Sequence, residues 1–240
     1  MVADMKLPDR LRTIADFIEK GSSVADIGTD HGLLPVYLAR YGLADNIIAS
    51  DISRGSLRAA LRTATKHGVL TKITFIAAPG LSGLGEMDAD TIVLAGMGGE
   101  TIAGIINDAP WTRRHEIRLI LQPQSKTTEL YTFLRENGYI IHNAKLAYDN
   151  KKYYVILLAM GGESDSTLTP ELELLTQFMN REDPLFAGYL DYLIEKTRRV
   201  IDKIKNSGTP EIQDMAIKLS TYMTLKENSS RKYEDMSDSG

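Results

Sequence analysis

The chain has 240 residues, of which 43% are hydrophobic and 25% charged, so it can bury a full-sized core and is neither disordered nor collagen-like. It has no cysteine and four scattered histidines, which excludes a disulfide framework, a thiol nucleophile and a thiolate metal site; we expect no metal. No apolar run approaches the roughly 20 residues of a membrane helix, and the first residues lack the apolar core of a signal peptide. We therefore expect a soluble cytoplasmic protein that binds no membrane.

The net charge of −4 is unevenly divided along the chain. Residues 1–162 contain 18 Lys+Arg and 17 Asp+Glu, a balance of +1, whereas residues 163–240 contain 10 and 15, a balance of −5. An acidic total does not favour nucleic-acid binding, but it allows a local basic face. The excess of acid lies in the C-terminal part.

Apolar runs alternate with amphipathic helical segments over the first 160 residues. This alternation predicts an α/β fold with a doubly wound, Rossmann-like, mostly parallel sheet. We expect the last two strands to form an antiparallel hairpin at or near one edge, and a ligand to lie beyond the carboxyl ends of the strands. The predicted strands are residues 23–27, 46–50, 72–77, 91–95, 117–122, 139–147 and 153–160, and the predicted helices are 7–18, 33–41, 53–67, one from about 99, and 126–137.

The composition changes after Gly161, where a polar linker leads to Thr169 and Pro170, a typical helix start. Two apolar stripes at helical spacing follow, one from Phe186 to Ile204 and one from Ile212 to Met223, with a turn at 206–211. We predict a catalytic domain at 1–162, an antiparallel helical (coiled-coil) hairpin at 163–228, and a loose tail at 229–240.

The first predicted strand ends in a loop that is rich in acid and glycine. Its residues are Asp26, Ile27, Gly28, Thr29, Asp30, His31 and Gly32. The dinucleotide pattern G-x-G-x-x-G is missing, because Asp30 stands at its third position. Two acids suit a ligand with positive charge, such as S-adenosylmethionine; alternatively, Asp30 only caps the next helix. His31 either orients the loop or contacts a target base.

Two further strand ends carry candidate site residues. Asp51, followed by Ile52, is placed to accept hydrogen bonds from ribose hydroxyls, which would suit NAD as well as S-adenosylmethionine; alternatively it caps a helix. The fourth strand leads into Ala95, Gly96, Met97, Gly98 and Gly99, which leave backbone exposed and space for a flat acceptor; the alternative is a tight turn. Residues 122–124 would face the same crevice.

Several basic residues are candidates for contact with nucleic acid. Arg54, Arg58 and Arg62 recur every four residues on one predicted helix, and either meet phosphates or form an ordinary solvated face. Further candidates are Arg10 near the N-terminus and, in the hairpin, a basic cluster containing Lys196 and Arg199 with Arg198, Lys203 and Lys205.

These residues together resemble the bacterial tRNA (adenine-22-N1)-methyltransferase family. The resemblance covers most of the chain and rests on Arg10-Leu11, ADIGTDHGLLP (25–35), ASDI (49–52), AGMGGETI (95–102), LQPQ (121–124), KKYYVI (151–156) and the C-terminal hairpin. It implies a class I methyltransferase fold with a seven-stranded sheet, S-adenosylmethionine as cofactor, and methylation of N1 of a tRNA adenosine. The family usually has Gly-Asp-Gly-Leu after the third strand, with its acid by the cofactor adenine; here Ala78, Pro79 and Gly80 are expected at the cofactor without a carboxylate.

N1 of adenine carries an in-plane lone pair, so it can attack a sulfonium methyl group without prior deprotonation. The enzyme must then align the reacting atoms and stabilise the cationic product, for which Asp30 is the candidate. Two alternatives stay open: a methyltransferase for another RNA or a protein, and a non-catalytic S-adenosylmethionine-binding RNA module. The sequence leaves the oligomeric state undetermined, as a monomer or a weak dimer.

Overall fold

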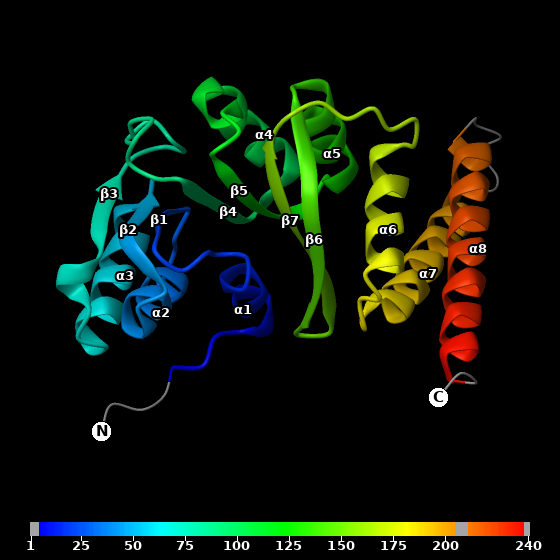
Figure 1. Cartoon of the computed structure of the whole chain (residues 1–240), viewed down its shortest axis with the longest axis horizontal. Coiled ribbons are helices and arrows are strands. Elements are labelled where there is room, and N and C mark those ends of the chain that lie inside the picture. The colour runs from blue at the N-terminus through cyan, green and yellow to red at the C-terminus, as the bar shows by residue number, and fades with distance from the viewer. Residues whose placement is uncertain (1–4, 205–210, 238–240) are drawn as a thin grey trace. The chain divides into compact units, whose positions relative to one another are not determined.

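The computed structural model describes residues 5–204 and 211–237, with side chains as far as Ser229 (Figure 1). Its centre is a seven-stranded sheet in the order β3-β2-β1-β4-β5-β7-β6, which confirms the predicted doubly wound sheet. Only β7 is antiparallel to its neighbours β5 and β6, as expected for a terminal hairpin. The strands are β1 (Ser22–Ile27), β2 (Ala44–Asp51), β3 (Thr74–Ala77), β4 (Thr91–Gly98), β5 (Arg118–Ser125), β6 (Tyr139–Asp149) and β7 (Lys152–Gly161).

The helices of this part lie close to their predicted positions. Ser53 caps the third helix with its hydroxyl oxygen, which accepts the backbone N–H of Ser56. Residues 70–72 form a 3-10 turn, so the third strand begins later than the predicted residue 72. The helices are α1 (Asp9–Ala15), α2 (Leu33–Tyr41), α3 (Arg54–Lys66), α4 (Gly99–Asn107) and α5 (Thr127–Glu136), with short 3-10 helices η1 (Leu70–Lys72) and η2 (Pro110–Arg113).

One buried cluster holds the central strands in place. Val24, Val93 and Ile120 project from β1, β4 and β5, and each is at most 1% exposed. They share the cluster with Ile14 of α1 and Leu38 of α2, both fully buried. Because side chains alternate along a strand, the same apolar spacing that fills this core fixes where each strand ends.

The chain reverses its direction of travel across the sheet at β1. This strand pairs in parallel with β2 on one side and β4 on the other. The loops that follow β1 and β4 therefore leave toward helices on opposite faces, and in sheets of this kind the ligand crevice lies between two such loops at the carboxyl ends of the strands. This is the place where the sequence predicts the ligand.

The chain forms two compact units, Met1–Leu174 and Leu175–Gly240. The division falls within α6 (Pro170–Asn180), later than the domain boundary predicted after residue 162.

The C-terminal unit corrects two sequence predictions. Three helices are described in this part of the chain, whereas the predicted hairpin has two. The additional break is a turn at residues 181–185, which contains Pro184 and separates α6 from α7 (Phe186–Ile204). The last helix, α8 (Glu211–Ser237), continues through most of the segment predicted as a loose tail. The remaining tail, 238–240, and most of the predicted turn at 206–211 lie outside the described residues, as does Lys205.

The hairpin itself is formed by α7 and α8, which pack against each other. Asp191 near the start of α7 forms an ion pair with Lys226, far along α8, so the two helices are antiparallel. Phe178 of α6 lies 6.0 Å from Phe186 of α7, measured between ring centroids. Within the described residues, no helix is long and apolar enough to cross a membrane.

Candidate cofactor and acceptor site

Asp26 is a buried acid near the end of β1. It is 7% exposed, and its Oδ2 accepts a hydrogen bond from the Thr29 hydroxyl at 2.7 Å. Burial raises the pKa of the Asp26 carboxyl from its ordinary value of 3.8 to about 6, while the Thr29 hydroxyl and the Arg10 guanidinium offset part of that rise. A cationic ligand beside this group would stabilise its ionised form.

Asp51, at the end of β2, holds two neighbouring loops together. Its Oδ2 accepts the backbone N–H of Asp30 at 3.1 Å, and its Oδ1 accepts that of Ser53 at 2.7 Å. Asp51 is itself 9% exposed, and each carboxylate oxygen retains a lone pair for a second donor. The next side chain, Ile52, is 74% exposed and offers an apolar surface beside the carboxylate.

Gly28 is a point of close contact between the loop after β1 and the end of β4. Its φ of +73° is a conformation that side chains rarely adopt. A Cβ at this position would lie 2.3 Å from the Cε atom of Met97, so the Met97 side chain covers the glycine. Ile27 and Thr29 flank this position on the same loop, and both are buried. The structure thus brings the two predicted loops together.

Asp30 and His31 are the exposed members of the first loop. Their side chains are 71% and 66% exposed, with 3.8 Å between the Asp30 Oδ2 and the His31 Nε2. The alternative that Asp30 caps the next helix is wrong, because the capping position of α2 is Gly32 and no side chain bonds to that helix end. The Asp30 backbone, at φ +51°, is instead held by Asp51. Its carboxylate therefore stays available to a ligand in the crevice.

The glycine run after Ala95 is partly explained by packing. Gly99 begins α4, and a Cβ there would lie 2.1 Å from the carbonyl oxygen of Lys126, so α4 and the start of α5 approach closely. Gly96 has a φ of +79° and is exposed, and Gly98 occupies the capping position of α4 in an extended conformation. The tight-turn alternative therefore accounts for Gly96, and close packing of α4 on the start of α5 accounts for Gly99.

Arg10, which the sequence predicts as an RNA contact, lies beside the strand ends that carry the other candidate site residues. Its Nη1 donates to Oε1 of Gln122 at 2.8 Å, and its guanidinium lies 5.7 Å from the ring centroid of Tyr154. A Cβ on Gly96 would be 3.8 Å from the same Nη1. Gln122 is fully buried and Arg10 half-buried, and the Arg10 guanidinium is close enough to Asp26 to lower the pKa of its carboxyl. The sequence analysis did not identify Tyr154 as a site residue, although it belongs to KKYYVI.

The loop after β3 borders a cavity of about 350 Å³. Pro79 and Gly80 line it, and Ala78 is half-buried beside them. The opposite wall includes Ile105 of α4 and Trp111, the only tryptophan of the chain. The segment carries no carboxylate toward the site, as the sequence indicates.

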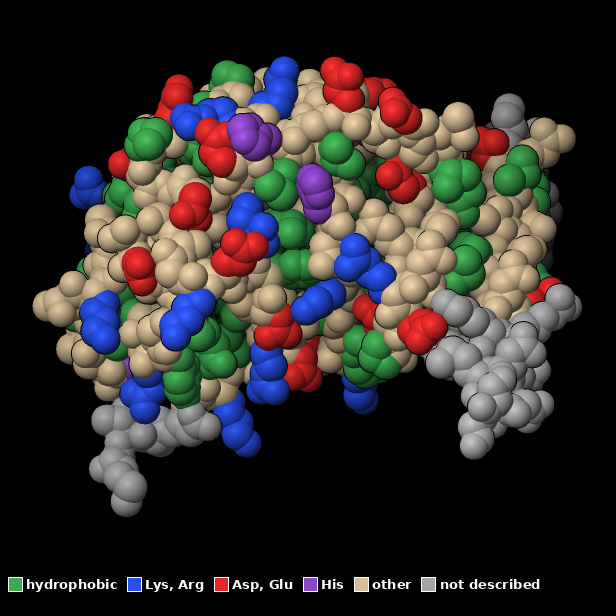
Figure 2. All heavy atoms as spheres, in the orientation of Figure 1, with side chains coloured by type: hydrophobic (Ala, Val, Ile, Leu, Met, Phe, Trp, Pro, Cys, Tyr) green, Lys and Arg blue, Asp and Glu red, His purple; other side chains and the backbone are tan. Residues whose placement is uncertain are grey.

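The predicted basic stripe forms an exposed face of α3. Arg54, Arg58 and Arg62 are all exposed, and none forms an ion pair within the described part of the chain. Figure 2 shows Lys and Arg side chains gathered over the region of α1, α2 and α3 in the N-terminal unit. In the C-terminal unit, Lys196 lies 5.9 Å from the Tyr192 ring centroid, whereas Arg199 forms an ion pair with Glu195 at 2.8 Å.

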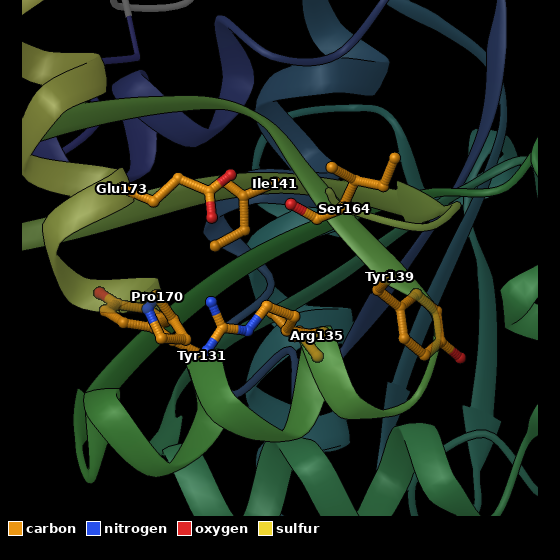
Figure 3. A pocket seen from close by; sticks show the side chains of 9 residues that line it. Tyr131, Arg135, Tyr139, Ile141, Ser164, Pro170 and Glu173 are labelled. Carbon is orange, nitrogen blue, oxygen red and sulfur yellow. The ribbon is translucent and has the colours of Figure 1, made fainter. Parts of the chain in front are cut away.

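A second cavity lies between α5, β6 and the linker (Figure 3). Its volume is about 20 Å³, which holds little more than one water molecule. Arg135 donates a hydrogen bond to the carbonyl oxygen of Leu168, and Pro170 and Glu173 line the same cavity. This cavity therefore marks where the linker packs on the N-terminal unit, and it is too small for a substrate. No group of three metal-binding side chains occurs among the described residues.

Comparison with known proteins agrees with this geometry. Residues 7–157 match a family model described as a methyltransferase domain. A tRNA (adenine(22)-N(1))-methyltransferase of Bacillus subtilis is 33% identical over 163 residues, which are 68% of this chain and 68% of that protein. The crystal structure of the M1A22 tRNA methyltransferase of Bacillus subtilis is 26% identical with a TM-score of 0.74, covering 94% of this chain and 99% of that chain. A Streptococcus pneumoniae protein in complex with S-adenosyl-L-methionine is 25% identical with a TM-score of 0.78, covering 92% of this chain and 100% of that chain.

Proposed function

Because the chain belongs to the tRNA (adenine-22-N1)-methyltransferase family, we propose that it methylates N1 of adenosine 22 in tRNA with S-adenosylmethionine. The observation that carries this proposal is the pair of buried carboxyl groups, Asp26 and Asp51, at the ends of neighbouring strands beside an exposed Asp30. Such a site is complementary to a ligand with a ribose and positive charge.

The residues present fit S-adenosylmethionine, which supplies an electrophilic methyl group on a sulfonium. Asp51 would bind the ribose hydroxyls, and the exposed Ile52 would cover the adenine together with the loop at Pro79. Asp26 would attract the ammonium group, and Arg10, with guanidinium N–H groups beyond the one bonded to Gln122, would pair with the carboxylate. Opposite charges in one crevice suit a zwitterionic amino acid.

The acceptor side of the crevice has three tasks. Gly96, Gly98 and the Met97 side chain would bound the space for the flat base, since they form the end of β4, where the Met97 side chain lies against Gly28. Alignment of N1 with the methyl group and exclusion of water would supply most of the acceleration. Asp30 would stabilise the charge that develops on adenine, and His31, next to it, would contact the base. In a duplex N1 is paired, so the target nucleotide must be unpaired or extruded.

Transfer of labelled methyl groups to an unmodified tRNA transcript, followed by nucleoside analysis, tests the function. We expect 1-methyladenosine in the transcript and none when adenosine 22 is replaced by guanosine. Label in another RNA or in protein would favour the alternative acceptor, and binding of S-adenosylmethionine without any transfer would favour the non-catalytic module. The absence of a carboxylate at Ala78 and Pro79 is the feature that motivates this last comparison.

We further propose that tRNA contacts the basic face of α3 and the C-terminal helices, and that the protein acts in the cytoplasm. The exposed cations Arg54, Arg58 and Arg62 support the first contact, and Lys196 supports the second more than Arg199, which is already paired. A chain ending after Thr169 keeps the linker bond from Arg135 to Leu168. We expect it to bind S-adenosylmethionine but to methylate tRNA poorly; full activity would contradict a role for the C-terminal helices.

A further inference from the structure

The turn between β6 and β7 carries an aromatic and basic surface that the cofactor site does not use. We refer to residues 148–153 as the hairpin tip. Tyr148 pairs with Tyr153 and Asp149 with Lys152 across the two strands. Asn150 and Lys151 form the turn with φ of +49° and +62°, the left-handed conformation that a tight two-residue hairpin turn requires. The two strands lie side by side and pair as far as Asp149 and Lys152, directly before the turn (Figure 1).

The sheet topology places the hairpin tip at the same edge of the sheet as the acceptor side of the site. Gly98 of β4 pairs with Ser125, the last residue of β5. β7 is antiparallel both to β5 and to β6, so β6 runs in the same direction as β4 and β5. The turn that follows β6 therefore lies at the carboxyl end of the strands, where the glycine run of β4 also lies.

The two faces of the hairpin tip differ. Ala147 is buried in the core cluster, and Tyr154 packs against that cluster and under Arg10, so one face is covered. Because side chains alternate along a strand, Tyr148 and Tyr153 lie on the opposite face. Their ring centroids are 4.7 Å apart, and Tyr148 is 44% exposed. An exposed tyrosine ring thus lies on the face that α1 does not cover.

The charge of the hairpin tip suits a polyanion. Lys151 and Lys152 are both exposed, and neither forms an ion pair within the described residues. An exposed aromatic ring beside free cations is the combination that binds single-stranded nucleic acid, where the base stacks on the ring and the cations contact phosphates. Two lysines in a turn would not by themselves indicate an RNA-binding surface. The exposed ring beside them, and the position of the turn at the same edge of the sheet as Gly98, are the additional observations.

We propose that the hairpin tip binds an unpaired nucleotide next to the target adenosine, with its base stacked on Tyr148 and its phosphate near Lys151 and Lys152. This proposal rests on the proposed RNA methyltransferase function. Taking an adenine out of its pair and stack leaves the neighbouring base without a stacking partner. The Tyr148 ring replaces that stacking partner. The RNA strand is thereby held at the edge of the sheet where the acceptor site lies.

The test compares three variants with one matched control in the full-length protein. The variants are Tyr148→Ala, Tyr148→Phe and the double change Lys151→Gln/Lys152→Gln; the control is Lys72→Gln, an exposed lysine in η1 that precedes β3 and so lies at the opposite, amino end of the strands. Fluorescence anisotropy with labelled tRNA over a range of salt gives Kd and its salt dependence. Calorimetry gives Kd for S-adenosylmethionine.

We expect Tyr148→Ala to raise the tRNA Kd about 5- to 100-fold, Tyr148→Phe to stay near the parent, and Kd for S-adenosylmethionine to stay unchanged in all variants. The double lysine variant should lower the slope of log K against log salt by about 1.4–1.8, and Lys72→Gln should not. Parental tRNA affinity in Tyr148→Ala, while the parent methylates tRNA, would overturn the proposal. A parent that methylates no RNA would instead overturn the proposed function. If Tyr148→Ala fails to fold, the double variant Lys151→Gln/Lys152→Gln tests the proposal. A parental slope of log K against log salt in that variant also overturns the proposal.

Discussion

Replacing Asp26 with asparagine should make the protein more stable at high pH and leave it unchanged at low pH. Asparagine keeps the shape of the side chain and can still accept the Thr29 hydroxyl, but it never ionises. In the parent, burial raises the Asp26 pKa from 3.8 to about 6, so folding favours the protonated form. This favourable contribution is complete below pH 3.8 and is lost as the pH rises through about 6.

The size of the effect follows from the two pKa values. A difference between 3.8 and about 6 corresponds to about 3 kcal/mol in the free energy of unfolding. We therefore expect Asp26→Asn to exceed the parent by about 3 kcal/mol at pH 8 and by close to zero at about pH 3, below both pKa values. Urea denaturation of the cofactor-free protein at several pH values measures the difference. Asp45→Asn, at an exposed position of β2, is the control and should show no such trend.

The reasoning would be refuted by a difference between Asp26→Asn and the parent that does not change with pH, or by one of opposite sign. The same variant should bind S-adenosylmethionine more weakly than the parent, since an ammonium group bonds more strongly to a carboxylate than to a neutral amide oxygen. At pH 6, where the parent carboxyl is partly protonated, binding should release protons from the parent and not from the variant. Calorimetry in buffers of different ionisation enthalpy measures that release.

Three further changes test the other parts of the site. Asp51→Ala should weaken S-adenosylmethionine binding by about 1.5–3 kcal/mol in calorimetric titration, and unchanged affinity would place the ribose elsewhere. Asp30→Asn should lower kcat with little change in cofactor affinity, whereas a parental kcat in the folded variant would rule out its electrostatic role. Arg54→Ala, Arg58→Ala and Arg62→Ala should each reduce the slope of log K for tRNA binding against log salt by nearly one. A parental slope would show that these arginines form an ordinary solvated face.

The fold was predictable because its signals are local. Apolar spacing predicts all seven strands, and the predicted helix at 53–67 agrees closely with α3 and its cap Ser53. The errors also have local causes. The sequence of α8 beyond residue 229 lacks apolar periodicity, so it was assigned to a tail, and Pro184 was passed over although proline commonly ends a helix.

The site was predictable only in part, because its geometry depends on contacts distant in sequence. Asp26, Gly28 and Asp51 were identified from strand ends, and these do meet at one crevice. The sequence predicts Arg10 only as an RNA contact, because nothing near it in the sequence indicates that it is half-buried beside the cofactor site. Its partner Gln122 is 112 residues away, and Tyr154 reaches it only through the hairpin. Likewise, no local pattern could show that Met97 covers Gly28.

The distribution of acids in the crevice bears on which of them can accelerate the reaction. Methylation of a neutral adenine moves one positive charge from the sulfonium to the base and creates none. A carboxylate therefore lowers the barrier only to the extent that it lies closer to the charge in the transition state than in the ground state. Asp26 is buried beneath the loop and near Arg10, so it would favour the bound cofactor as much as the transition state. Asp30 stands exposed on the rim with its backbone fixed by Asp51, and is the acid that can favour the charge once it has moved. We therefore propose that Asp26 contributes to cofactor binding and that Asp30 acts in the chemical step.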